Sequence, residues 1–154
     1  MTDVHKGLLA RSRPELVALL REEIEAAGRI TFARFMEQAL AHPEHGYYTA
    51  GDAAPGFGGD FLTAPETHAL FGTLLARQLA ECWDRLGQPA RFVVREHGAG
   101  TGALALSVMA GLRDERPDAL AATRYELGDV SSRRVAAGLA SADEAGVARQ
   151  AAAG

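Results

Sequence analysis

Apolar residues recur at helical spacing over two segments near the start of the chain, and this periodicity predicts two helices. The first begins after Ser12, which stands at capping-box spacing from Glu15, and it stops at Gly28. The second is capped by Thr31 and keeps its apolar positions as far as Leu40. Between residues 42 and 65 the pattern disappears in a stretch rich in glycine and proline. A loop of this length is usually functional or disordered, and its aromatic residues argue against disorder.

A longer helix is expected from Thr63, which is again at capping-box spacing from Glu66, to Gly87. Its predicted buried face is an apolar stripe formed by Leu70, Phe71, Leu74, Leu75, Leu79, Cys82, Trp83 and Leu86. Cys82 is the only cysteine, so an internal disulfide is excluded. Its apolar neighbours favour a buried core thiol over a nucleophile.

The period then changes from that of a helix to that of a strand. Residues 91–96 form a short, β-branched run that stops at glycines, as expected of a buried parallel strand. A helix is predicted from about Ala103 to Glu115, a second strand over residues 124–130, and a further helix capped by Ser131. Strand, glycine loop, helix and strand make a βαβ unit, which requires a parallel sheet. The predicted fold class is therefore α/β, with the start of a Rossmann-like domain.

Three regions follow from these patterns. Residues 1–89 are interpreted as a helical N-terminal extension that contains the glycine-rich loop 42–65. Residues 90–141 are interpreted as the start of a cofactor-binding, Rossmann-like domain. Residues 142–154 are rich in alanine and glycine and lose the apolar stripe, so we expect a low-complexity tail, as in a truncated chain.

Composition narrows the class of protein further. At 154 residues and 47% hydrophobic content, the chain can form a packed core. The net charge of −4, with both signs scattered, argues against a nucleic-acid partner. No window approaches the roughly 18 apolar residues of a membrane-spanning helix, and no secretory signal is apparent. We therefore expect a soluble, cytoplasmic protein without membrane insertion.

The glycine-rich loop after the first predicted strand carries the most chemistry. Glycine tolerates positive φ and lets the backbone approach a ligand, and the following helix offers free N–H groups at its start. The carboxylate of Glu96, at the end of the strand, can accept hydrogen bonds from an amine-bearing ligand. Asp129, at the end of the second strand, can bind ribose hydroxyls. The loop residues themselves are Gly98, Ala99, Gly100, Thr101 and Gly102.

Several cofactor classes use such a loop. A P-loop is excluded because no Gly-Lys-Ser/Thr follows the glycines. A dinucleotide site remains open, since Gly98, Gly100 and Ala103 satisfy its fingerprint. Against it, Asp129 lies 31 residues after Gly98, further than usual, and a long segment precedes the first strand. An S-adenosylmethionine site uses both acids and is favoured. The alternative without a ligand is a tight turn that packs helix on strand.

Four upstream clusters give the chain a resemblance to a known family. Their order and spacing resemble those of the MidA-like methyltransferases, and the match extends from about Arg21 to Ser131. The clusters are Ile30–Met36, His42–Tyr48, Gly59–Glu66 and Phe71–Gly72. The resemblance implies a class I methyltransferase fold, S-adenosylmethionine as cofactor, and a protein side chain as acceptor, arginine in the relatives that take part in complex I assembly.

The resemblance also implies roles for individual residues. Glu96 would face the amino-acid end of the cofactor, the Gly98–Gly102 backbone would pack on its ribosyl-methionine portion, and Asp129 would hold the ribose. Asp60 is the candidate catalytic residue, orienting cofactor or acceptor; a loop carboxylate that caps nearby N–H groups is the alternative. The segment around Asp60 would approach the cofactor and the substrate entrance, through Gly59, Phe61, Thr63 and Pro65.

The sequence also departs from the family pattern. Family members are longer and contain later strands that are absent here, and His97 stands where Leu or Tyr is commoner. Two alternatives therefore stay open: a non-catalytic binding or assembly module, and an NAD-binding oxidoreductase fragment. Unpaired strand edges predict a partner, or self-association, that covers the sheet edge. His42 and His45 are interpreted as turn caps, and no metal site is predicted.

Overall fold

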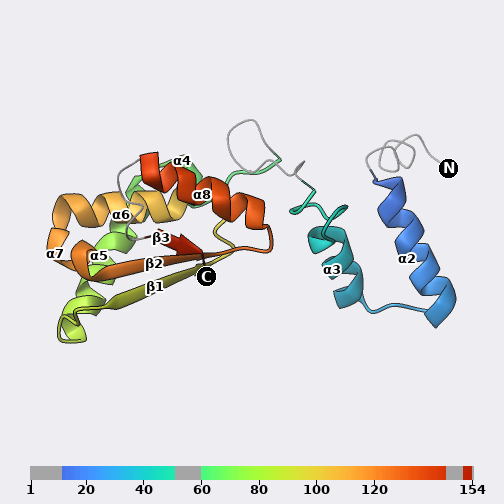
Figure 1. Cartoon of the computed structure of the whole chain (residues 1–154), viewed down its shortest axis with the longest axis horizontal. Helices are drawn as coiled ribbons and strands as arrows, with labels where there is room; N and C mark the ends of the chain where they lie inside the picture. Colours follow the sequence, from blue (N-terminus) through green and yellow to red (C-terminus); the bar gives the residue numbers. More distant parts are fainter. Residues whose placement is uncertain (1–11, 51–59, 145–150, 154) are drawn as a thin grey trace. The chain divides into compact units, whose positions relative to one another are not determined.

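The computed structural model describes residues 12–50, 60–144 and 151–153. Contacts divide the chain into two units, Met1–Ala54 and Pro55–Gly154, which are considered separately below. Figure 1 shows the elements of each unit along the chain.

The first unit contains two helices, α2 (Pro14–Ala27) and α3 (Phe32–Ala41). The cap of α3 is as predicted, because the side chain of Thr31 accepts a hydrogen bond from the backbone N–H of Arg34 at 3.1 Å. The prediction for α2 is wrong by one residue. Pro14 takes the first helical position, so Arg13 becomes the N-cap and no side-chain cap forms there. Gly28 ends α2 with a left-handed φ of 76°, as the sequence predicts.

After α3 the chain turns at His42. Its Nδ1 accepts the backbone N–H groups of Glu44 and His45, both at 3.2 Å, which confirms the turn-capping interpretation for His42. Two backbone hydrogen bonds close the turn further. The N–H of Tyr47 donates to the carbonyl of Ala39, and the N–H of Tyr48 donates to that of Leu40.

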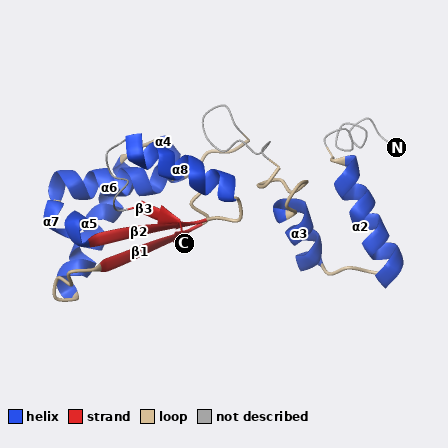
Figure 2. Ribbon diagram, in the orientation of Figure 1, coloured by secondary structure: helices blue, strands red, loops and turns tan. Residues whose placement is uncertain are grey.

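The second unit is a parallel sheet with helices packed on it, and it confirms the predicted α/β class (Figure 2). The strands run in the order β1-β2-β3, all parallel. Phe92 pairs with Thr123 at one end of the β1–β2 ladder and His97 with Gly128 at the other. The elements, in chain order, are α4 (Ala64–Thr67), α5 (Leu70–Arg85), β1 (Phe92–His97), α6 (Ala103–Glu115), α7 (Pro117–Ala122), β2 (Thr123–Gly128), α8 (Ser132–Glu144) and β3 (Ala151–Ala153).

The long helix expected from Thr63 is in fact two helices. Thr63 and Glu66 do form the predicted capping box at the start of α4. The helix nevertheless ends after one turn, because His68 adopts an extended conformation and its Nδ1 accepts the backbone N–H of Leu70 at 3.0 Å. An imidazole that competes for backbone donors in this way is not visible in hydrophobic spacing.

The buried face of α5 also differs from the prediction. Its fully buried members are Gly72, Ala76, Ala80 and Trp83. Leu70, Phe71, Leu74, Leu86 and Cys82 are exposed, so the expectation of a buried thiol is wrong. The predicted stripe is confirmed only for Leu75, Leu79 and Trp83, which pack on the core. The reason is close packing against α6: a Cβ on Gly72 would lie 2.0 Å from Oγ of Ser107, so only small residues fit at this crossing.

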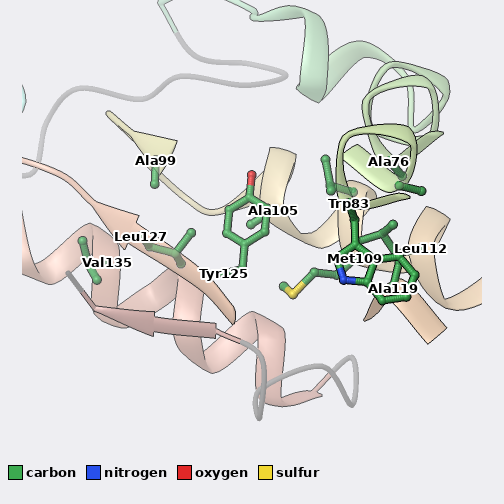
Figure 3. Packing of buried hydrophobic residues seen from close by; sticks show 12 residues of the cluster. Ala76, Trp83, Ala99, Ala105, Met109, Leu112, Ala119, Tyr125, Leu127 and Val135 are labelled. Carbon is green, nitrogen blue, oxygen red and sulfur yellow. The ribbon is translucent and has the colours of Figure 1, made fainter. Parts of the chain in front are cut away.

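The core of the second unit lies between α5, α6, α7, α8 and one face of the sheet. Figure 3 shows this cluster, with Tyr125 and Leu127 contributed by β2. Its largest fully buried side chains are Met109, Leu112, Leu127 and Val108.

The two faces of β1 differ. Phe92 and Val94 pack on the core, whereas Val93 is 41% exposed on the opposite face. The prediction of a strand buried on both faces is therefore wrong for the described part of the chain, where the helices cover one face. Two further elements were not predicted, α7 and the short strand β3, which lies where a tail was expected.

Candidate functional site

The glycine loop connects the end of β1 to the start of α6 and is shaped by three left-handed residues. Gly98, Gly100 and Gly102 have φ values of 73°, 54° and 76°. L-residues with a side chain rarely adopt such angles, which explains the glycines. The loop is tied to β2, because the N–H groups of Gly98 and Ala99 donate to the carbonyl of Gly128 at 2.8 and 3.0 Å.

The loop presents one open and one closed side. A Cβ built on Gly98 or Gly100 would meet no atom within 4 Å. At Gly102 a Cβ would lie 3.1 Å from the Cα of Gly138 in α8. Gly102 is therefore required for packing, whereas Gly98 and Gly100 leave their backbone accessible to a ligand.

Asp129 follows β2 directly and braces this loop. Its Oδ2 accepts the backbone N–H of Gly100 at 2.9 Å, and its Oδ1 accepts that of Ser131, also at 2.9 Å. One carboxylate thus joins the glycine loop to the residue that precedes α8. Each oxygen retains a second lone pair, so the carboxylate can still accept ribose hydroxyls.

Glu96 lies near the end of β1, on the core face of the sheet. Its Oε2 accepts a hydrogen bond from the hydroxyl of Tyr125 at 2.9 Å. Within the described residues its Oε1 accepts none, so it can receive an amine from a ligand. Burial raises the pKa of Glu96 above its ordinary value, while the hydrogen bond from Tyr125 lowers it. Burial, together with the nearby Glu96 charge, raises the pKa of Tyr125.

The upstream candidates lie at the start of α4. Thr63 donates both its N–H and its hydroxyl to Oε2 of Glu66, at 2.9 and 2.8 Å. Phe61 is exposed and Pro65 lies in the first turn of α4. Asp60 is exposed as well, and Gly59 lies outside the described residues. Because α4 packs against α6, this segment belongs to the same unit as the glycine loop.

Sequence reasoning missed two residues of this site. The sequence pattern predicts only that Tyr125 lies in a strand. Its contact with Glu96 depends on the register between β1 and β2. Gly138 lies within α8, where it touches the glycine loop. An isolated glycine in a predicted helix is the signal that could have identified this close approach.

The fold and the site together define a class. A parallel βαβ unit carries a glycine loop between an acidic residue near the end of β1 and another after β2. This arrangement is that of a Rossmann-like domain of the class I methyltransferase type, and the glycine loop is its candidate cofactor site.

Comparison with known proteins finds methyltransferases among the relatives of this chain. A family model described as a putative S-adenosyl-L-methionine-dependent methyltransferase matches residues 74–142. The chain is 38% identical over 104 residues to the mitochondrial protein arginine methyltransferase NDUFAF7 homolog of Drosophila melanogaster. It is also 38% identical over 85 residues to human NDUFAF7, named in the same way. Over these segments the chain is similar to the MidA-like methyltransferases, as its sequence motifs predicted.

Solved structures agree. A likely methyl transferase from Burkholderia thailandensis, bound to S-adenosyl-homocysteine, superposes with a TM-score of 0.72 at 37% identity, and the match covers 90% of this chain and 36% of that one. A second structure from the same organism gives a TM-score of 0.69 at 33% identity, over 90% of this chain and 34% of that one.

The chain covers only a small part of the length of these relatives. The aligned part is 68% of this chain but 24% of the fly protein, and 55% of this chain but 19% of the human one.

The comparison also corrects the prediction of cellular location. These relatives are named mitochondrial, which points to the mitochondrion and overturns the expected cytoplasmic location. No helix among the described residues is long and apolar enough to cross a bilayer.

Proposed function

We propose that this chain binds S-adenosylmethionine at the Gly98–Gly102 loop and forms the cofactor-binding part of a methyltransferase. The observation that carries the proposal is the open side of the loop. Gly98 and Gly100 expose their backbone to open space, between an acidic residue in β1 and another after β2. The solved relative bound to S-adenosyl-homocysteine supports the same cofactor class.

Each site residue has a defined task in this proposal. Glu96 accepts the cofactor's amino group through Oε1, the backbone of Gly98, Ala99, Gly100 and Gly102 packs on its ribosyl-methionine portion, and Asp129 accepts the ribose hydroxyls. Phe61, Thr63 and Pro65 border the cofactor from the α4 side. Asp60 orients the cofactor or the acceptor.

The chemistry that remains is mainly positional. The bound cofactor supplies an electrophilic methyl group, so the protein has to align donor and acceptor and exclude water. The acceptor we propose is a protein side chain, specifically arginine, because the relatives are named protein arginine methyltransferases. Transfer of labelled methyl groups to arginine-containing and lysine-containing peptides, followed by amino-acid analysis, tests this. Label on lysine alone would contradict the arginine assignment.

Cofactor binding is tested by titration calorimetry of the whole chain with S-adenosylmethionine, S-adenosyl-homocysteine and NAD. We expect heat with the first two and none with NAD. Binding of NAD alone would transfer the chain to the oxidoreductase class. No binding by a chain that is folded by circular dichroism would refute the proposal.

A glycine pair provides a matched control. Gly98→Ala and Gly87→Ala both place a side chain at a left-handed φ, 73° and 81°, and both added Cβ atoms meet open space. The two variants therefore pay a similar conformational cost, but only Gly98→Ala obstructs the proposed site. We expect Gly98→Ala to weaken S-adenosyl-homocysteine at least about tenfold, equivalent to about 1.4 kcal/mol, and Gly87→Ala to leave its affinity unchanged.

A second candidate is a non-catalytic binding module, which one observation favours. In the described part of the chain β1 is an edge strand, and Val93 on its open face is 41% exposed. Such an edge favours pairing with a partner or with a second copy. Sedimentation of wild type and Val93→Lys distinguishes the cases: self-association that the lysine abolishes, without cofactor binding, supports the module.

A further inference from the structure

Tyr125 is a buried tyrosine whose hydroxyl serves the candidate site. It lies in β2 with 3% of its surface exposed, and its ring packs in the core cluster (Figure 3). In the parallel register it pairs with Val94, two residues before Glu96 on β1. Residues two apart share one face of a strand, so Glu96 lies on the same face as Tyr125, one step further along the sheet. The 2.9 Å hydrogen bond between their side chains follows from this register.

Packing alone does not account for the hydroxyl. A phenylalanine would fill the same space in the core without a polar atom that needs a partner. The hydroxyl donates to Oε2 of Glu96, the oxygen next to the one that the proposed function assigns to the ligand. One oxygen of Glu96 is therefore fixed by the protein and the other is left for the cofactor.

We propose that Tyr125 is a positioning residue for cofactor binding: it holds the Glu96 carboxylate so that Oε1 meets the cofactor's amino group. This inference rests on the proposed function. Tyr125 itself stays in the core and acts through Glu96.

The hydrogen bond from Tyr125 is the interaction that favours the charged form of Glu96. Burial raises the pKa of Glu96, and the hydrogen bond from Tyr125 opposes that rise. Among the described residues Glu96 forms no ion pair. Arg95 and His97, its neighbours on β1, project to the opposite face of the sheet. Asp129 is the acidic residue that follows β2. Its carboxylate already accepts hydrogen bonds from the N–H groups of Gly100 and Ser131.

Tyr125→Phe removes the hydroxyl with little change of shape. Without its donor, the Glu96 carboxyl becomes protonated at a higher pH, and its protonated form binds an amine poorly. The measurement is the affinity for S-adenosyl-homocysteine between pH 5 and 8.5, by calorimetry on the whole chain. We expect the affinity of Tyr125→Phe to fall at a higher pH than that of wild type. The variant should therefore bind more weakly than wild type at the acid end of this range, and the difference should shrink towards pH 8.5.

Glu96→Gln supplies the second arm of the experiment. It should bind weakly at every pH, without the inflection, and adding Tyr125→Phe to it should change nothing further. Should Tyr125→Phe fail to fold, 3-fluorotyrosine incorporation keeps the test open. It strengthens the phenol as a donor and should move the inflection to lower pH. The other two tyrosines, Tyr47 and Tyr48, belong to the first unit.

The outcomes separate the inference from the function beneath it. If wild type binds S-adenosyl-homocysteine and neither Tyr125 change moves the inflection, the inference is wrong and the proposed function stands. A uniform loss of affinity at all pH values, present also in the Glu96→Gln background, would show a packing role and overturn the inference as well. If wild type fails to bind at any pH, the proposed function falls and the inference falls with it.

Discussion

Gly102 and Gly138 meet without space for a side chain between them. A Cβ on Gly102 would lie 3.1 Å from the Cα of Gly138, and a Cβ on Gly138 would lie 3.2 Å from the carbonyl oxygen of Thr101. The contact joins the end of the glycine loop to α8, two elements separated by α6, α7 and β2 in the sequence. The position of α8 therefore helps to set the shape of the candidate site.

Gly102→Ala should destabilise the second unit by two combined effects. A left-handed alanine costs about 1–2 kcal/mol, and overpacking against α8 adds about 1–3 kcal/mol. Urea denaturation followed by the fluorescence of Trp83, the only tryptophan, reports on this unit. Gly87→Ala is the control, since its φ of 81° is equally left-handed but its added Cβ touches nothing. Equal losses in the two variants would contradict the close contact.

Gly72→Ala tests the crossing of α5 and α6. By helix propensity alone the change should stabilise α5 by up to about 1 kcal/mol. The added Cβ, however, would lie 2.5 Å from Cβ of Ser107 and 2.8 Å from its backbone carbon, which a side-chain rotation cannot relieve. We expect a net loss of about 1–3 kcal/mol in the free energy of unfolding. Gln78→Ala, on the exposed face of the same helix, should be close to neutral, and a gain in Gly72→Ala would refute the tight crossing.

The same crossing shows what hydrophobic spacing can and cannot predict. The periodicity of α5 correctly indicates a helix, and Trp83 correctly marks its core face. The side of the helix that packs is decided by Gly72 and Ala76, which hydrophobic scales weight little. Large leucines such as Leu74, 52% exposed, look like core residues although the approach of α6 leaves no room for them there. The sequence pattern predicts that the segment is a helix, whereas close packing decides which of its faces is buried.

The glycine loop was more predictable than the contacts behind it. Glycines at Gly98, Gly100 and Gly102 are required by local backbone angles, which depend on neighbours in the chain. The Glu96–Tyr125 hydrogen bond depends on which residues of two strands lie side by side. No local pattern fixes that register, because a shift of one residue is compatible with the same composition.

Acid should weaken the second unit through Asp84. Arg116 binds this carboxylate at 2.7 and 2.9 Å, Gln88 donates to it as well, and these hydrogen bonds lower the pKa of Asp84 from 3.8 to about 2. A lowered folded pKa means that the contribution is present above about pH 4 and is lost as the pH falls towards 2. Melting temperatures by circular dichroism should therefore drop over this window in wild type and drop less in Asp84→Asn. Glu81→Gln, on the same helix, should keep the wild-type slope; an unchanged slope in Asp84→Asn would contradict the assignment.

Asp129→Asn should separate the brace of the loop from the charge of the site. The carboxylate accepts two backbone N–H groups, one on each oxygen. An asparagine keeps one acceptor and turns an N–H₂ group towards the other donor, so either Gly100 or Ser131 loses its partner. A hydrogen bond to a charged group contributes about 1.5–3 kcal/mol, and we expect a loss in this range by urea denaturation. Asp114→Asn, an exposed change on α6, is the control and should be neutral.

The same variant bears on the cofactor. If Asp129 holds only the loop, the affinity for S-adenosyl-homocysteine should recover when the fold is stabilised by cooling or by an osmolyte such as TMAO. If it also accepts ribose hydroxyls, as proposed, the affinity should remain at least about tenfold weaker under stabilising conditions, because one ribose hydroxyl then faces an amide N–H₂ donor in place of an acceptor. Wild-type affinity in a fully folded Asp129→Asn chain would remove Asp129 from the ligand site and leave it as the brace between the glycine loop and α8.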